Sequence, residues 1–131
     1  MKKLGVLNYQ ISSVIASMGH MDHITIGDAG LPIPKGVERI DLALVPGIPE
    51  FLQVVEAVVA ELEVEQIILA EEIKEFNPMI EQALLKLFNG TEVVYVSHSE
   101  MKAKSAESRA VIRTGECSPY ANVILVSGVT F

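Results

Sequence analysis

The sequence predicts a single α/β domain of three layers, with a mostly parallel central sheet and helices on its faces. From residue 50 onward, stretches with apolar residues at helical spacing alternate with short apolar runs typical of buried strands. Such alternation implies parallel strands joined by helical crossovers. The chain has 131 residues, of which 50% are hydrophobic, and this suits one compact domain over residues 1–131.

The first element is expected to be a helix from Asn8 to about Met18. Asn8 is a good N-cap, and a glycine at 19 can adopt the left-handed conformation that closes a helix. His20 should then lie exposed in a turn just past the helix end. The alternative is a surface or capping histidine without a function. The apolar stripe of this helix consists of Ile11, Val14, Ile15 and Met18.

Residues 23–27 read as a buried strand, and residues 28–34 as a loop stiffened by two prolines. Loops at the end of buried strands often carry catalytic or binding residues, which favours Asp28 as a functional residue. The alternative is a turn aspartate that binds the backbone two residues on. A metal site built from His20, Asp22, His23 and Asp28 is disfavoured, because no cysteine or distant histidine pair completes a ligand set.

The middle of the chain alternates between the two kinds of element. We expect strands at 39–44, 66–70 and 92–96, a helix at 51–62, and a second helix that Asn77 caps and Pro78 opens. The strand at 92–96 delivers His98 at its carboxyl end, where Ser99 should cap a short helix. His98 thus repeats the arrangement of Asp28. The acidic residues Glu61, Glu63, Glu65, Glu71, Glu72 and Glu75 are interpreted as a solvated face.

Near the carboxyl terminus, two apolar strands around 111–112 and 123–126 flank a charged turn at 113–116. Tyr120 and Asn122 are two positions apart, so they should share one face of an extended segment. A phenol and a carboxamide together suit sugar hydroxyls. The alternative is a buried tyrosine with a satisfied hydroxyl and a turn asparagine. Cys117 is interpreted as a small apolar residue, because no histidine lies near it in sequence.

Composition excludes several classes of partner. The chain has 17 acidic and 10 basic residues, a net charge of −7, and no Lys/Arg cluster, so neither nucleic acid nor an anionic membrane is expected. The apolar runs are far shorter than the ~20 residues that span a bilayer. The sequence Met-Lys-Lys-Leu leads directly into a capped helix rather than a signal-peptide apolar region. One cysteine allows no internal disulfide, and we expect a cytoplasmic protein.

Taken in order, these motifs closely resemble the D-ribose pyranase family, relatives of the fucose mutarotases. The resemblance covers residues 1–131 and is carried by the stretches 19–20, 27–34 (Gly-Asp-Ala-Gly-Leu-Pro-Ile-Pro), 39–43, 69–72, 98, 112–116 and 119–122. It implies that His20 is the catalytic acid and that Asp28, His98, Tyr120 and Asn122 bind the sugar. It also implies a cytoplasmic homo-oligomer, a decamer of two pentameric rings, with D-ribose as substrate and no metal or organic cofactor.

The expected reaction interconverts β-D-ribopyranose and β-D-ribofuranose by opening and closing a hemiacetal, which requires only proton transfer and orientation. We expect His20 to protonate the ring oxygen, and Asp28 and His98 to hold hydroxyls or accept the anomeric proton. Tyr120 and Asn122 would fix the sugar. The alternatives are a mutarotase for fucose or another aldose, and a non-catalytic sugar-binding ring protein.

One geometric expectation follows from the strand at 23–27. If residues 21–28 are extended at ~3.3 Å each, His20 and Asp28 lie roughly 25 Å apart at opposite ends of it. A site that uses both residues then needs a bent path or a neighbouring subunit. We therefore predict that the pocket lies between protomers. A His20 ring that is walled into the interior or bound to a metal ion, and that is out of reach of any cavity shared with Tyr120 and Asn122, would contradict the assignment.

Overall fold

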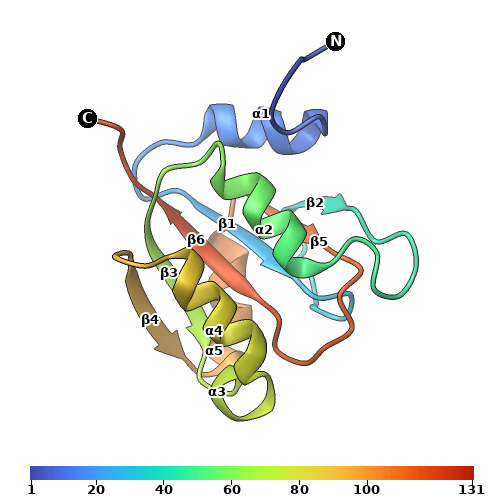
Figure 1. Cartoon of the computed structure of the whole chain (residues 1–131), viewed down its shortest axis with the longest axis vertical. Coiled ribbons are helices and arrows are strands. Elements are labelled where there is room, and N and C mark those ends of the chain that lie inside the picture. Colours follow the sequence, from blue (N-terminus) through green and yellow to red (C-terminus); the bar gives the residue numbers. More distant parts are fainter.

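The computed structural model describes all residues, 1–131, as one domain around a six-stranded sheet (Figure 1). The order across the sheet is β2 (Glu38–Asp41), β5 (Ala110–Arg113), β1 (His23–Gly27), β6 (Val123–Ser127), β3 (Val64–Ala70) and β4 (Glu92–Val96). The neighbours β2/β5, β5/β1 and β3/β4 are parallel, whereas β6 is antiparallel to both β1 and β3. The sheet is therefore mostly parallel, as predicted.

Helices cover both faces of the sheet. The larger core lies under α1 (Tyr9–Ser17), α2 (Phe51–Val59) and α4 (Pro78–Leu87), and a smaller core lies under α5 (His98–Lys104). Figure 1 shows α2 and α4 in front of the sheet and α5 behind it. A short helix, α3 (Ile73–Phe76), follows β3, and a 3₁₀ turn, η1 (Ser105–Glu107), follows α5. The predicted three-layer α/β class is confirmed.

Strand β1 shows how the sequence divides between the two cores. Ile24 and Ile26 are fully buried in the larger core. Thr25, between them, faces the other side, where its hydroxyl hydrogen-bonds Ser108 at 2.7 Å. This alternation is the expected consequence of strand geometry. Because β1 is extended, a residue just before it and a residue just after it lie at opposite ends of the strand.

Three local expectations are wrong. Gly19 does not take a left-handed conformation: helix α1 ends because Met18 is extended, and Met21 adopts the positive φ, 67°. Ser97, not Ser99, caps α5, because it forms a capping box with Glu100 and so makes His98 the first helical residue. Strand β2 ends at Asp41 rather than at residue 44, since the chain then enters a turn closed by an isolated antiparallel β-bridge between Val45 and Ile48.

The helices are short. None of them combines the length and the apolar character that crossing a bilayer demands.

Candidate functional site

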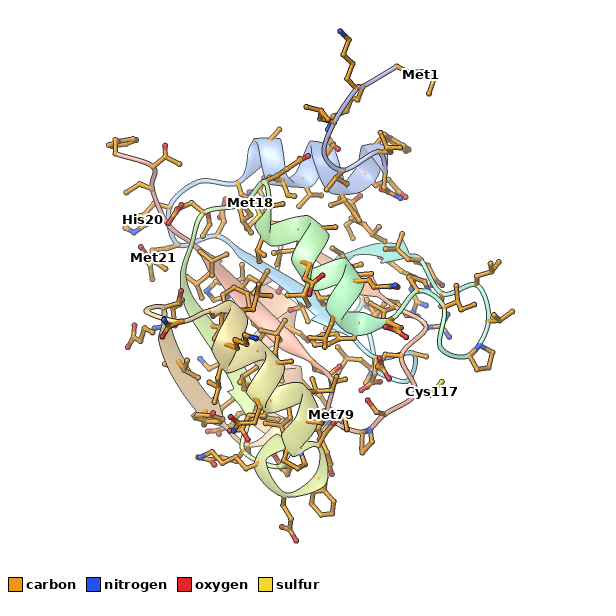
Figure 2. The ribbon with its side chains drawn as sticks, in the orientation of Figure 1. Met1, Met18, His20, Met21, Met79 and Cys117 are labelled. Atoms are coloured by element: carbon orange, nitrogen blue, oxygen red, sulfur yellow. The ribbon has the colours of Figure 1, made fainter.

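His20 lies in the loop between α1 and β1, and its side chain is 54% exposed. The expectation of an exposed imidazole is confirmed. Its Nε2 hydrogen-bonds Oε2 of Glu65, at the start of β3, over 2.9 Å. Figure 2 shows His20 at the margin of the molecule, beside Met21 and away from Cys117. The ring is therefore presented to solvent and held on one side by a carboxylate.

A cleft of about 480 Å³ opens beside His20. Its walls are the end of α1, the turn at residues 61–63 and the chain end at residues 127–131. Glu61 and Glu63 line this cleft, and Glu65 does not. Tyr120 and Asn122 do not line it either, so within one chain His20 does not share this cleft with them.

The other predicted residues gather at the opposite end of β1. Asn122 accepts a hydrogen bond from the Asp28 backbone N–H through Oδ1 and donates one from Nδ2 to Asp28 Oδ2, both 2.9 Å long. The Asn122 side chain is fully buried. The remaining Asp28 oxygen accepts from the Gly30 N–H at 2.9 Å, so Asp28 also has the turn role that was the alternative to a functional one. Asp28 lines a cleft of about 290 Å³.

Tyr120 and His98 form the second half of this cluster. Their rings meet edge to face, with centroids 5.0 Å apart, and the ring of Phe76 also packs against Tyr120, with centroids 5.5 Å apart. Tyr120 has a positive φ of 56° in a turn in which its carbonyl accepts from the Asn122 N–H. The expectation of an extended segment is therefore wrong, because this turn sends Tyr120 toward His98 and Asn122 toward Asp28.

The environment of His98 favours a neutral ring. Burial and then the positive charge of Lys102, one helical turn away, lower the pKa of His98, while Glu72 and Asp28 oppose the shift. The His98 backbone N–H donates to both carboxylate oxygens of Glu72, at 2.9 and 3.1 Å. Nδ1 of His98 is buried and has no hydrogen-bond partner.

Two site residues escaped the sequence reasoning, which assigned Glu65 and Glu72 to a solvated acidic face. Glu72 had a usable signal, since it follows the end of β3 as Asp28 follows the end of β1. Glu65 had none, because 45 positions separate it from His20 and only the sheet brings them together.

The four residues Asp28, His98, Tyr120 and Asn122 thus stand at one edge of the sheet. The parallel strands β1 and β4 end there, and the antiparallel β6 begins there. His20 stands at the other end of β1, as the strand geometry predicted. No group of three or more His, Cys, Asp or Glu side chains has the arrangement to hold a metal ion.

The sequence matches the model of the RbsD / FucU transport protein family over residues 1–130. It is 58% identical to the D-ribose pyranase of Actinobacillus pleuropneumoniae serotype 7 over 139 aligned positions, and 57% identical to that of Symbiobacterium thermophilum over 131, with complete coverage of all chains. Bacillus subtilis RbsD complexed with D-ribose superposes with a TM-score of 0.97 at 47% identity, with 100% of both chains covered. The Streptococcus pneumoniae fucose mutarotase, in complex with L-fucose, shares the fold over both whole chains with a TM-score of 0.84 at 21% identity.

Proposed function

This chain belongs to the RbsD / FucU transport protein family, and we propose that within it the chain is a D-ribose pyranase, an isomerase that interconverts β-D-ribopyranose and β-D-ribofuranose. The observation that carries this conclusion is the full-length similarity to D-ribose pyranases, in sequence and in fold. The similarity to the fucose mutarotase extends only to the fold, so ribose is favoured over fucose as substrate.

The chemistry matches the side chains that are available. Opening the ring breaks the bond between C1 and the ring oxygen, adds a proton to that oxygen and removes one from the anomeric hydroxyl. An exposed imidazole can carry out such a transfer near neutral pH. We propose His20 as the acid that protonates the ring oxygen. The exposure of its ring and its position on a cleft support this role.

We propose that the Asp28 cluster binds the sugar. The His98 imidazole and the Tyr120 phenol stand side by side there, and both groups can hydrogen-bond sugar hydroxyls. Because the Asn122 side chain is buried and bound to Asp28, we assign its contribution to holding Asp28 in place. The reaction needs no cofactor, since it involves proton transfer and orientation alone.

A sugar cannot contact both His20 and Asp28 of one chain, because β1 separates them. We propose that the site forms between protomers, with His20 from one chain and the Asp28 cluster from the next. Exposed apolar side chains near both half-sites support such contacts, since patches of this kind mark interfaces. They are Val129 and Phe131, which line the cleft of His20, and Leu44 and Val45, which line a pocket with Ala29, the residue after Asp28. From the family resemblance we propose a decamer of two pentameric rings.

We further propose a cytoplasmic location. Its support is the family resemblance together with the acidic charge and the single, unpaired Cys117. Fractionation of the source cells, with the protein detected by antibody, tests this location.

The activity is tested by NMR saturation transfer between the ring forms and anomers of D-ribose. We expect the chain to accelerate exchange and His20→Ala to abolish the acceleration, while D-ribose still binds. Binding without acceleration by the unmodified protein would instead identify a sugar-binding ring protein. A panel of aldoses in the same assay, fucose included, tests the preference for ribose.

A further inference from the structure

His20 makes a single side-chain hydrogen bond, and it involves Nε2. The partner is Oε2 of Glu65, at 2.9 Å. An ionised carboxylate only accepts hydrogen bonds, so Nε2 must carry the proton in this contact. A neutral imidazole has one N–H, and Nδ1 is then the unprotonated nitrogen. The contact with Glu65 therefore selects one tautomer of His20.

The backbone around this pair is fixed by the end of β6. Ser127 accepts a hydrogen bond from the Met21 N–H and donates one to the Asp22 carbonyl, both 2.9 Å long. The next residue, Gly128, donates to the Glu63 carbonyl at 3.0 Å. The loop that carries His20 and the strand that carries Glu65 are thus tied to the same two residues.

Because Gly128 has no side chain, it also leaves room for the side chain of Glu65. A Cβ at position 128 would lie 3.2 Å from the Glu65 Cβ, closer than an ordinary contact. The chain end thus passes close to the base of the Glu65 side chain, and a larger residue at position 128 would crowd it.

Glu65 does not line the cleft that His20 lines. Its carboxylate binds one side of the ring while the ring meets the cleft, so Glu65 is placed to act on His20 rather than on a ligand in the cleft. An exposed pair of this kind contributes little to folding stability. A carboxylate that orients an imidazole and fixes its tautomer can contribute much more to proton transfer.

We propose that Glu65 is a positioning residue that holds His20 with Nε2 protonated, so that Nδ1 is the nitrogen that exchanges a proton with the sugar. This inference rests on the proposed role of His20 as acid. In the imidazolium form, the Nε2–H of His20 stays hydrogen-bonded to Glu65. The proton on Nδ1 passes to the ring oxygen of the sugar as the bond between C1 and that oxygen breaks. The proton of the anomeric hydroxyl leaves to a base, and the sugar becomes the open aldehyde. Ring closure returns both protons.

The test uses the full-length protein with D-ribose, in three variants. Glu65→Leu removes the acceptor, and Glu65→Gln keeps an amide oxygen that can still accept from Nε2–H. Glu56→Gln is the control, because Glu56 is an exposed acid on α2 that makes no side-chain hydrogen bond and does not line the cleft of His20. Circular dichroism checks that each variant folds.

Saturation transfer gives the exchange kinetics. We expect Glu65→Leu to lower kcat about tenfold or more, because the imidazole loses its orienting partner. We expect KM to stay within about twofold, because other residues bind the sugar. Glu65→Gln should retain more activity than Glu65→Leu, and Glu56→Gln should match the unmodified protein. Unchanged kcat in Glu65→Leu would overturn the inference.

Nitrogen-15 NMR of the His20 ring gives a second readout that a merely structural residue would not affect. We expect the neutral ring to be the Nε2–H tautomer in the unmodified protein and a mixture of tautomers in Glu65→Leu. A ring protonated at Nδ1 in the unmodified protein would overturn the inference. Loss of exchange in His20→Ala with full exchange in Glu65→Leu refutes only the role of Glu65. Full exchange in His20→Ala refutes the role of His20 on which the inference rests, and no acceleration by the unmodified protein refutes the proposed function itself.

Discussion

Asp28 and Asn122 bind each other through two hydrogen bonds that run in opposite directions, each 2.9 Å long. The pair joins the end of β1 to the start of β6, across 94 positions of the sequence. Because Asn122 is fully buried, its amide is the internal support of a carboxylate that lines a cleft. This relationship couples the stability of the sheet edge to the geometry of the proposed sugar site.

Replacing Asn122 by Ala should therefore lower both the free energy of unfolding and the affinity for D-ribose. We expect the free energy of unfolding to fall by about 1–3 kcal/mol, because Asp28 loses two hydrogen bonds with a buried side chain. Denaturant unfolding measures this loss, and calorimetry should show weaker D-ribose binding. Asn89→Ala is the control, since Asn89 is exposed and makes no side-chain hydrogen bond. Equal unfolding free energies for Asn122→Ala and the control would contradict the structural role.

The lowered pKa of His98 predicts a titration experiment. Burial is the largest cause and Lys102 the next, so Lys102→Met should raise the pKa of His98 part of the way to its ordinary value. Proton NMR of the His98 ring as a function of pH measures the shift. The folded protein favours the neutral ring. The stability that the neutral His98 ring contributes is therefore fully present above the ordinary histidine pKa of about 6.5, and it is lost as the pH falls below that value. A lower pKa in Lys102→Met would be inconsistent with this electrostatic assignment.

Tyr95 predicts an effect at alkaline pH. Its hydroxyl donates to Glu81 Oε1 at 2.7 Å, and burial together with this bond and the Glu81 charge raises the pKa of Tyr95 to about 12. A raised pKa contributes stability that is present below the ordinary value of 10.0 and is lost as the pH rises through about 12. Tyr95→Phe should lower the free energy of unfolding at neutral pH by about 1–2 kcal/mol, since Glu81 loses its donor.

Alkaline titration, followed by the absorbance of the ionised tyrosines, checks the raised pKa of Tyr95. The difference between the unmodified protein and Tyr95→Phe isolates the contribution of this residue. We expect the component that is lost in the variant to ionise near pH 12. Its appearance near the ordinary value of 10.0 would refute the contact with Glu81.

Glu116 predicts the opposite dependence. Burial raises the pKa of its carboxyl, but hydrogen bonds from the backbone and hydroxyl of Ser118 and from the Phe51 and Cys117 N–H groups outweigh burial and lower it. The resulting stability is present above the ordinary glutamate pKa of 4.5 and is lost as the pH falls through the lowered value. Glu116→Gln should therefore destabilise the protein at neutral pH and have little further effect in acid. Thermal unfolding at several pH values measures this, and a destabilisation that does not change with pH would argue against the assignment.

Local patterns in the sequence were enough to predict most of the fold. Helical spacing and the caps at Asn8 and Asn77 located α1 and α4, and apolar runs located the strands. The antiparallel β6 was not predicted, because strand direction depends on how the chain returns through the charged turn at 113–116, and no local signal records this. Ser97 and Ser99 are both suitable caps in the sequence, and Glu100 decides for Ser97.

The site could be predicted only in part. Glycine, proline and strand-exit signals pointed to His20, Asp28 and His98 one at a time. The turn at Tyr120 requires a left-handed backbone at a tyrosine, and no local signal in the sequence predicts one there. The contacts of His20 with Glu65 and of Asp28 with Asn122 are between segments distant in sequence, so only the assembled sheet reveals them.

The most direct test of a site between protomers is complementation between two inactive variants. His20→Ala and Asp28→Ala are each expected to lose ribose exchange in saturation transfer. When they are unfolded together and refolded as a 1:1 mixture, random assembly should restore about a quarter of the unmodified activity, because each site needs an intact His20 from one chain and an intact Asp28 from its neighbour. A mixture as inactive as its two components would contradict the shared site.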